Sequence, residues 1–241
     1  MSPENGVTIA TAAEVIGVLE GIHVADEYEL RLIEDTLQSG ASLQLASKAV
    51  WRVVYVAHGT ATVAGLGVAD DQAAYAHGDA EILAGDGGAA IWRWELAAVG
   101  DAPILVVGSH SASRMKLSAP IRQMAASSVL MRADSVTFPP GGCAYLHTHQ
   151  GPGIRCLIEG GIRIDMESTS TCYAPGGAWF EPGPAPVFAQ AAQDRASRFI
   201  RVMVLPAELE GRSSIAYVNA EDRDKPKSQR YKIYLDETIT P

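Results

Sequence analysis

Two histidines separated by a single residue, His147 and His149, are the side chains in this sequence whose spacing most clearly suggests chemistry. In a β-strand, residues two apart point to the same face, so the two imidazoles are expected to project together. Neutral imidazole is a ligand for Zn, Fe, Ni, Cu or Mn, and a mononuclear site adds further protein ligands or leaves positions open for water and substrate. The pair therefore predicts half of a metal site, with one divalent transition metal ion as the cofactor.

Two side chains close to this pair are candidate catalytic residues. Tyr145 lies two residues before His147 on the same predicted face, where its hydroxyl could donate a hydrogen bond to a bound ligand or simply be satisfied in a packed interior. Arg155 is also expected to point inward, and an unpaired charge in an apolar interior is very costly. Its partner is either a substrate carboxylate, held in bidentate geometry, or an internal acid such as Glu181 or Asp165.

Glu181 is the third candidate catalytic residue and the acid nearest the predicted mouth of the site. It could act as a third metal ligand or as a general base. It could equally be a rim residue exposed to water, which the turn beside it slightly favours. Cys143 and Cys156 are interpreted as small core residues, since free cysteines are usually buried and inert and no basic neighbour is evident.

The elements that must position these residues are short strands. Between Ser42 and Leu205, runs of Val, Ile, Tyr and Trp are broken by Gly, Pro and Asp, a texture typical of an antiparallel sandwich or barrel. A helix is predicted only near the N-terminus, from Thr11 to about Leu37, where apolar residues recur at helical spacing. In the tail, residues 231–235 alternate as one last strand, which could cross to another unit or to a neighbouring subunit.

Two stretches share an outline, which indicates an internal duplication. Tyr55–Gly59 and Cys156–Gly160 each form a strand that ends in a glycine turn and is followed by a strand and a second glycine turn. We infer two β-barrel-like units joined around residues 108–123, with a single sandwich as the alternative. The expected domains are an N-terminal helical extension, a first barrel without the histidine pair, a second barrel that carries it, and a tail with a last strand: 1–40, 41–115, 116–206 and 207–241.

The stretch from Gly141 to Gly160 resembles the first motif of the cupin superfamily: a glycine, five residues, His-x-His, three or four residues, Glu, six residues and a glycine. Gly141, His147, His149 and Gly160 match that pattern in register. Gly153 stands where the family has its liganding Glu. The liganding His of the second motif falls on Pro186 or Val187 here, so no histidine is supplied.

The resemblance covers about residues 42–205 and implies an all-β chain of two tandem double-stranded β-helix (jelly-roll) barrels, of which the first is degenerate. It also implies a metal-dependent enzyme that acts on a small polar or carboxylated molecule in the C-terminal barrel. Dioxygenase, isomerase, lyase and decarboxylase chemistry all occur in the family, so the reaction class stays open. Because two of four ligands are missing, a non-catalytic small-molecule-binding or regulatory protein is the alternative.

The composition of the chain indicates which classes of binding partner are expected. The net charge of -9 and the pI near 5.1, without any block of basic residues, disfavour nucleic-acid binding. The apolar runs are far shorter than the roughly 20 residues that cross a bilayer, and the first six residues lack the basic start of a signal peptide, so we expect a cytoplasmic protein. Exposed strands and the tail favour a homodimer paired across a two-fold axis.

Overall fold

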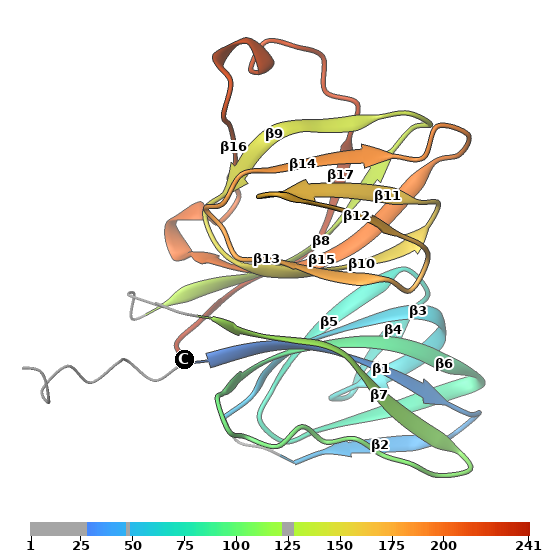
Figure 1. Ribbon diagram of the computed structural model, residues 1–241. Helices are drawn as coiled ribbons and strands as arrows, with labels where there is room; N and C mark the ends of the chain where they lie inside the picture. The colour runs from blue at the N-terminus through green and yellow to red at the C-terminus, as the bar shows by residue number, and fades with distance from the viewer. Residues whose placement is uncertain (1–27, 47–48, 122–127) are drawn as a thin grey trace, which may run out of the picture.

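The computed structural model describes residues 28–46, 49–121 and 128–241, and almost all of its regular structure is antiparallel strand (Figure 1). Two β-units lie one above the other. The strands of the N-terminal unit are β1 (Tyr28–Leu37), β2 (Ser42–Leu45), β3 (Trp51–Val63), β4 (Leu66–Ala69), β5 (Gln72–His77), β6 (Ala80–Ala98) and β7 (Ser111–Ile121). They form one sheet in the order β4-β3-β6-β1-β7, with β2 paired to β6 and β5 paired to β3.

The C-terminal unit is a sandwich of two five-stranded sheets, ordered β13-β10-β15-β8-β17 and β12-β11-β14-β9-β16. Two 3₁₀ turns, η1 (Ala207–Leu209) and η2 (Ala220–Asp222), lie in the segments that connect β15, β16 and β17. The strands are β8 (Val129–Phe138), β9 (Cys143–His149), β10 (Gly153–Glu159), β11 (Ile162–Met166), β12 (Thr169–Tyr173), β13 (Ala178–Glu181), β14 (Val187–Ala191), β15 (Ser197–Pro206), β16 (Ile215–Tyr217) and β17 (Arg230–Ile239).

The predicted all-β fold is confirmed, but the helix predicted up to Leu37 is wrong over its described part. Tyr28–Leu37 is strand β1, and it pairs with β6 on one side and β7 on the other. Its alternating Leu30 and Leu32 face one side of the sheet, a pattern that helical spacing obscured because Ile33 is buried on the opposite side. The segment from Thr11 to residue 27 lies outside the described residues.

The boundary between the units also differs from the expected one. The predicted division at residues 115/116 falls within β7, which pairs along its length with β1, so the N-terminal unit extends to Ile121. The tail is part of the C-terminal unit, because β16 pairs with β9 and β17 pairs with β8. The last strand therefore stays in its own unit, although two of its side chains reach the other one.

The two glycines that end the duplicated outline occupy equivalent conformations. Gly59 has φ of +85° and Gly160 has φ of +84°, in the left-handed region that disfavours side chains. A Cβ at either glycine would approach a backbone oxygen, that of Gly88 at 2.1 Å or that of Ala196 at 2.2 Å. Gly160 lies in the turn between β10 and β11, whereas Gly59 lies within β3 at a shift in its register with β6, so the turn predicted at Gly59 is wrong. Both positions nevertheless require glycine, which explains why the outline is visible in the sequence.

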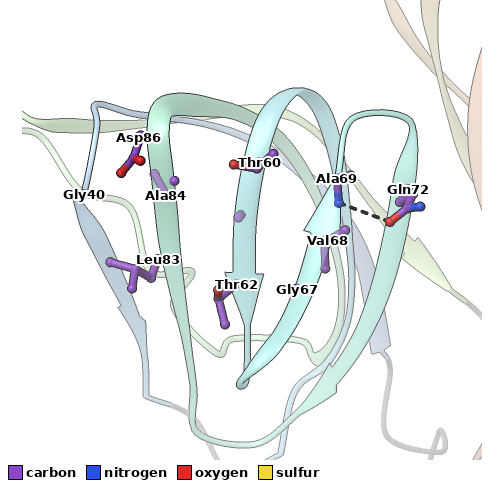
Figure 2. Close-up of a pocket in the computed structure, with 12 residues that line it drawn as sticks. Gly40, Thr60, Thr62, Gly67, Val68, Ala69, Gln72, Leu83, Ala84 and Asp86 are labelled. Atoms are coloured by element: carbon purple, nitrogen blue, oxygen red, sulfur yellow. Dashed lines mark hydrogen bonds between the residues drawn. The ribbon is translucent and has the colours of Figure 1, made fainter.

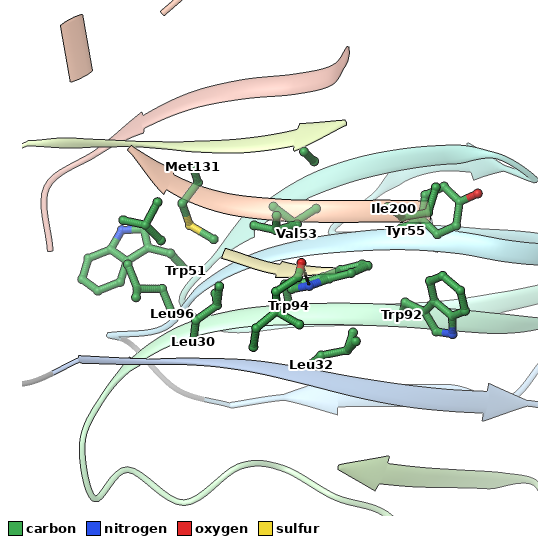
Figure 3. Packing of buried hydrophobic residues seen from close by; sticks show 14 of the residues in the cluster. Leu30, Leu32, Trp51, Val53, Tyr55, Trp92, Trp94, Leu96, Met131 and Ile200 are labelled. Carbon is green, nitrogen blue, oxygen red and sulfur yellow. Dashed lines mark hydrogen bonds between the residues drawn. The ribbon is translucent and has the colours of Figure 1, made fainter. Parts of the chain in front are cut away.

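A large apolar cluster lies between the two units and joins them (Figure 3). Trp92 and Trp94 both lie in this cluster, and the Trp94 indole donates a hydrogen bond of 3.1 Å to the carbonyl of Ile154 in the other unit. Met131 and Ile200 face them from the C-terminal unit. Each such side chain removed from water contributes about 1.5–3 kcal/mol, so the units are held firmly together.

A charged cluster lies at one end of this interface and is centred on Asp71, in the turn before β5. Its carboxylate accepts hydrogen bonds from Tyr55 of its own unit and from Arg198, Lys232 and Tyr234 of the C-terminal unit. Burial raises the pKa of Asp71, but these four donors outweigh burial and hold that pKa well below its usual range. The ionised carboxylate thus ties β17 and β15 to the first unit.

We expect Asp71→Asn to lower the free energy of unfolding by about 1 kcal/mol at pH 7; the carboxylate is 36% exposed, so water screens its pairs. A depressed pKa contributes stability above the ordinary pKa of about 3.9, and that stability is lost as the pH falls toward the lower folded value. The difference between wild type and variant should therefore shrink below pH 4. Urea unfolding at pH 7 and pH 3 measures it, with exposed Asp70→Asn as the control; an equal difference at both pH values would contradict it.

The interior of the N-terminal unit holds a buried network of ion pairs. Arg93 donates to Asp35 at 2.9 Å and also pairs with Glu95, and Arg52 donates to Glu95 at 2.9 Å. All four side chains are 2% exposed or less. Backbone carbonyls of Gly78 and of residue 104 take further guanidinium protons. This network lies inside the N-terminal unit together with an apolar cluster that includes Val54 and Ile91. Among the described residues, no helix has the length and apolarity to span a membrane.

Candidate functional site

His147 and His149 lie inside the C-terminal unit, on β9, between neighbours β14 and β16. Both side chains point inward as predicted and are 5% and 3% exposed. Their Nε2 atoms are 3.2 Å apart, and the two rings meet at an interplanar angle of 83°. The strand thus brings two imidazole nitrogens to one point in the interior.

Both imidazoles are held in the form that binds metals or protons. Nδ1 of His147 donates to the carbonyl oxygen of Tyr145 at 2.7 Å, which leaves its Nε2 lone pair free. Burial lowers the pKa of His147, and it lowers the pKa of His149 further, with the guanidinium groups of Arg155 and Arg201 adding to that effect. Near pH 7 the pair is therefore neutral, the form in which imidazole binds a metal cation.

The prediction that Tyr145 shares the face of His147 is wrong. Val187 pairs with His147, but Ala189, two residues on, pairs with Ala144, three residues back, so β9 contains a bulge. An extra residue reverses the alternation of side chains. Ala144 consequently lines the interior, whereas Tyr145 is half-buried on the outside, where the ammonium groups of two tail lysines lie 5.0 and 5.6 Å from its ring centre.

Arg155 and Glu181 form an internal ion pair, which was one of the two alternatives for Arg155. Nη2 of Arg155 lies 2.7 Å from Oε2 of Glu181, and the two residues are 0% and 6% exposed. The interpretation of Glu181 as a water-exposed rim residue is therefore wrong. Burial lowers the pKa of Arg155 to about 10, and the Glu181 carboxylate partly offsets that. Asp165, the other acid predicted as a possible partner, instead pairs with Arg163 on the surface.

Glu181 stands opposite the position that the family motif reserves for an acid. On the paired strands β10 and β13, Gly153 and Glu181 are direct neighbours, and Oε2 of Glu181 lies 3.5 Å from Nε2 of His149. Gly153 itself has no room for a side chain, because a Cβ there would lie 2.7 Å from Met203 Cγ and from the Val202 carbonyl. A carboxylate from the adjacent strand thus reaches the place where the motif lacks one.

Sequence reasoning missed a second buried ion pair in this interior. Arg201 on β15 donates to both carboxylate oxygens of Asp134 on β8, at 2.6 and 2.9 Å, and both residues are at most 6% exposed. In the sequence, each of these two residues is a charged residue at an inward position of an otherwise apolar strand, which is the feature that could have indicated the pair. Together with Tyr231, Arg201 helps to line a cavity of about 20 Å³ beside the two histidines, large enough for one water or ion.

The donor atoms at this cavity suit a transition metal ion only in part. Two imidazole nitrogens 3.2 Å apart, and a carboxylate oxygen 3.5 Å from one of them, are close to the separation of about 3.3–3.6 Å between ligands of a tetrahedral ion. The 2.7 Å contact with Arg155 lacks hydrogen-bond geometry, so Oε2 of Glu181 is otherwise unsatisfied. In the described part of the chain, however, no three His, Cys, Asp or Glu residues form a ready metal-binding group. The residues therefore fit an ion held by the two histidines, with further ligands still to be supplied.

A larger hollow, of about 590 Å³, lies in the N-terminal unit, between β3, β4 and the start of β6 (Figure 2). Thr60, Thr62 and Gln72 give it hydroxyl and amide groups, and Asp86 is the one acid among its described lining residues. It is an open trough far from the histidines, and these lining residues offer no base, nucleophile or ligand pair. The chemistry therefore belongs to the smaller cavity in the C-terminal unit.

Neither protein-family profiles nor curated proteins match this sequence. Among solved structures, the oxalate decarboxylase of Lactobacillus farciminis in its formate complex aligns with a TM-score of 0.59 and 13% identity, over 83% of this chain and 82% of that one. The oxalate decarboxylase of Bacillus subtilis gives 0.57 and 14%, over 86% and 74%. A putative glyoxylate-induced protein of Pseudomonas aeruginosa gives 0.50 and 12%, over 74% of each chain. The chain therefore has the all-β jelly-roll fold of the cupin proteins, as its histidine motif predicted.

Proposed function

We propose that this chain is a metal-dependent cupin enzyme that acts on a small polar or carboxylated molecule in its C-terminal barrel. One observation carries the proposal: Nε2 atoms of His147 and His149 converge at 3.2 Å beside a small buried cavity, and a buried carboxylate oxygen lies next to them. Two Nε2 atoms at this distance need either the hydrogen of one neutral imidazole between them, as an ordinary hydrogen bond, or a cation bound to both lone pairs.

In this proposal the side chains have distinct roles. His147 and His149 bind the ion, which when bound would polarise a coordinated oxygen of the substrate. Glu181 serves as a third ligand or as the group that accepts a proton, and Arg155 is a positioning residue that holds the Glu181 carboxylate. Tyr145 has no part in it, because its ring lies outside the barrel. Two of the solved neighbours are named oxalate decarboxylases, so decarboxylation stands with dioxygenase, isomerase and lyase chemistry among the reactions to test.

A second candidate function is a binding or regulatory protein without turnover. The observation that favours it is the ion pair between Arg155 and Glu181, which occupies the carboxylate that a metal would use. Each of the two buried ion pairs, Arg155–Glu181 and Arg201–Asp134, is neutral in itself, so the interior carries no net charge that an ion would have to balance. Metal content separates the two candidates.

Elemental analysis of the purified protein should show about one transition metal ion per chain, lost in His147→Gln/His149→Gln, because the imidazole nitrogens are its first ligands. Glutamine keeps polar atoms in the interior, so circular dichroism should show the fold unchanged. The matched control removes two exposed histidines, His58→Gln/His110→Gln, and should retain the metal. If wild type takes up no Mn, Fe, Co, Ni, Cu or Zn after incubation with each, the enzyme proposal fails and the binding protein stands.

A further inference from the structure

A second hollow, of about 210 Å³, opens next to the histidine cavity. Its walls come largely from the tail: Arg212, Ser213 and Ser214 precede β16, and Tyr231 and Ile233 lie on β17. The barrel side supplies Arg132, Asp134 and Arg201. We call this hollow the tail pocket. Arg201, Ile215 and Tyr231 line both the tail pocket and the histidine cavity, so these side chains form the boundary between the two.

We propose that the tail pocket is the substrate-binding pocket and that it selects a small carboxylic acid with a short apolar body. The carboxylate would face Arg201 and the apolar body would lie against Tyr231 and Ile233. This inference rests on the proposed function for its reaction, but the binding that it predicts needs no metal.

The charges around the tail pocket favour an anion. Arg132 uses four of its five N–H donors within the protein, to Asp236 and to the backbone carbonyls of Leu209 and Arg212. The hydrogen bonds of Arg201 to Asp134 use Nε and Nη2, which leaves Nη1 for a ligand. The exposed Arg212 forms no ion pair within the described ranges. The guanidinium groups of Arg132, Arg201 and Arg212 thus outnumber the carboxylates of Asp134 and Asp236 that pair with them. The pocket therefore carries a net positive charge.

The apolar wall indicates the other part of the ligand. Tyr231 and Ile233 are 48% and 53% exposed, large apolar side chains on adjacent same-face positions of β17. The Tyr231 ring lies over the Arg201 guanidinium at 5.7 Å, which positions that cation at the pocket wall. A volume of about 210 Å³ is below the roughly 300 Å³ at which drug-sized ligand sites begin, so a ligand of a few carbon atoms fits.

The strand pairing connects the tail pocket to the histidines. On the paired strands β16 and β9, Ile215 lies opposite His149 and Tyr217 lies opposite His147. The short strand that helps to form the pocket is therefore hydrogen-bonded to the strand that carries the candidate ligands. The tail is thus part of the binding site, in addition to any role in pairing with a second copy.

Backbone amide NMR of the metal-free full chain, titrated with butanoate and with butanamide as the uncharged analogue, tests the pocket. Butanoate should shift amides of residues 211–215 and 230–233 saturably, and butanamide should bind at least tenfold more weakly because it lacks the charge. Ile233→Trp, which fills the pocket, should weaken butanoate at least tenfold, and Arg212→Gln about threefold or more. Leu66→Trp, at an apolar position in the other unit that is 61% exposed against 53% for Ile233, should leave binding unchanged.

Equal binding of acid and amide, shifts centred elsewhere, or no shift at all would overturn the proposal. Concentration-dependent shifts of the same amides without ligand, abolished by Ile233→Trp, would show that a second copy covers this face and would also overturn it. These outcomes are independent of metal content. Butanoate binding to a chain that takes up no metal would leave the pocket standing while the enzyme proposal fails, and a metal-loaded chain that ignores butanoate would do the reverse.

Discussion

Replacing Arg93 by methionine is expected to lower the free energy of unfolding by about 3–5 kcal/mol. Arg93 is fully buried and neutralises Asp35 and Glu95, which have at most 2% exposure. Methionine fills much of the same volume but leaves Asp35 without an ion-pair partner among the described residues. Removal of one partner from a buried network costs far more than the intact pair contributes, because the remaining charge stays desolvated.

Equilibrium unfolding in urea, followed by tryptophan fluorescence, measures this loss. Arg163→Met is the matched control: Arg163 pairs with Asp165 on the surface, where the side chains are 44% and 35% exposed, and its loss should cost less than about 1 kcal/mol. A loss at Arg93 no larger than at Arg163 would show that water reaches the network, contrary to its burial.

Restoring the acid of the family motif, by Gly153→Glu, is expected to lower stability without improving metal binding. A Cβ at Gly153 would lie 2.7 Å from Met203 Cγ and from the Val202 carbonyl, and 3.0 Å from Nη1 of Arg155. Overpacking of this kind costs about 1–3 kcal/mol, and a second carboxylate beside Glu181 adds repulsion. Gly153→Glu thus restores the motif in the sequence but is expected to destabilise the folded protein.

Thermal or urea unfolding and metal titration of Gly153→Glu, alone and combined with Glu181→Gln, measure both effects. Gly67→Glu is the control, since a Cβ at Gly67 meets no atom within 4 Å and should be tolerated. Glu181→Gln should weaken metal binding at least tenfold if Glu181 is the third ligand, and Gly153→Glu should not rescue it. Rescue by the glutamate at position 153 would mean that the barrel relaxes enough to form the family site.

The fold was largely readable from the sequence because its signals are local. Short β-branched runs between turn residues predicted the strands, and the left-handed glycines Gly59 and Gly160 marked the duplicated outline. The helix predicted up to Leu37 was wrong because β1 is buried on both faces, which removes the alternation that distinguishes strand from helix.

The site was predicted only where the strand was regular. The rule that residues two apart in a strand share a face placed His147, His149 and Arg155 in the interior, and the structure has all three there. The same rule failed for Tyr145, because one extra residue in β9 turns the Tyr145 side chain to the opposite face. Nothing in the sequence alone indicated this bulge.

By itself, then, the sequence determined the β-rich fold class, the histidine pair and the absence of the motif acid, since each of these depends on residues a few positions apart. Tertiary structure alone decided which distant charges meet. Arg155 pairs with Glu181, Arg201 pairs with Asp134, and the tail closes a pocket beside them. The physical reason is that a buried charge must find a partner across strands, and the register of those strands is set by packing of the whole barrel rather than by any local run of residues.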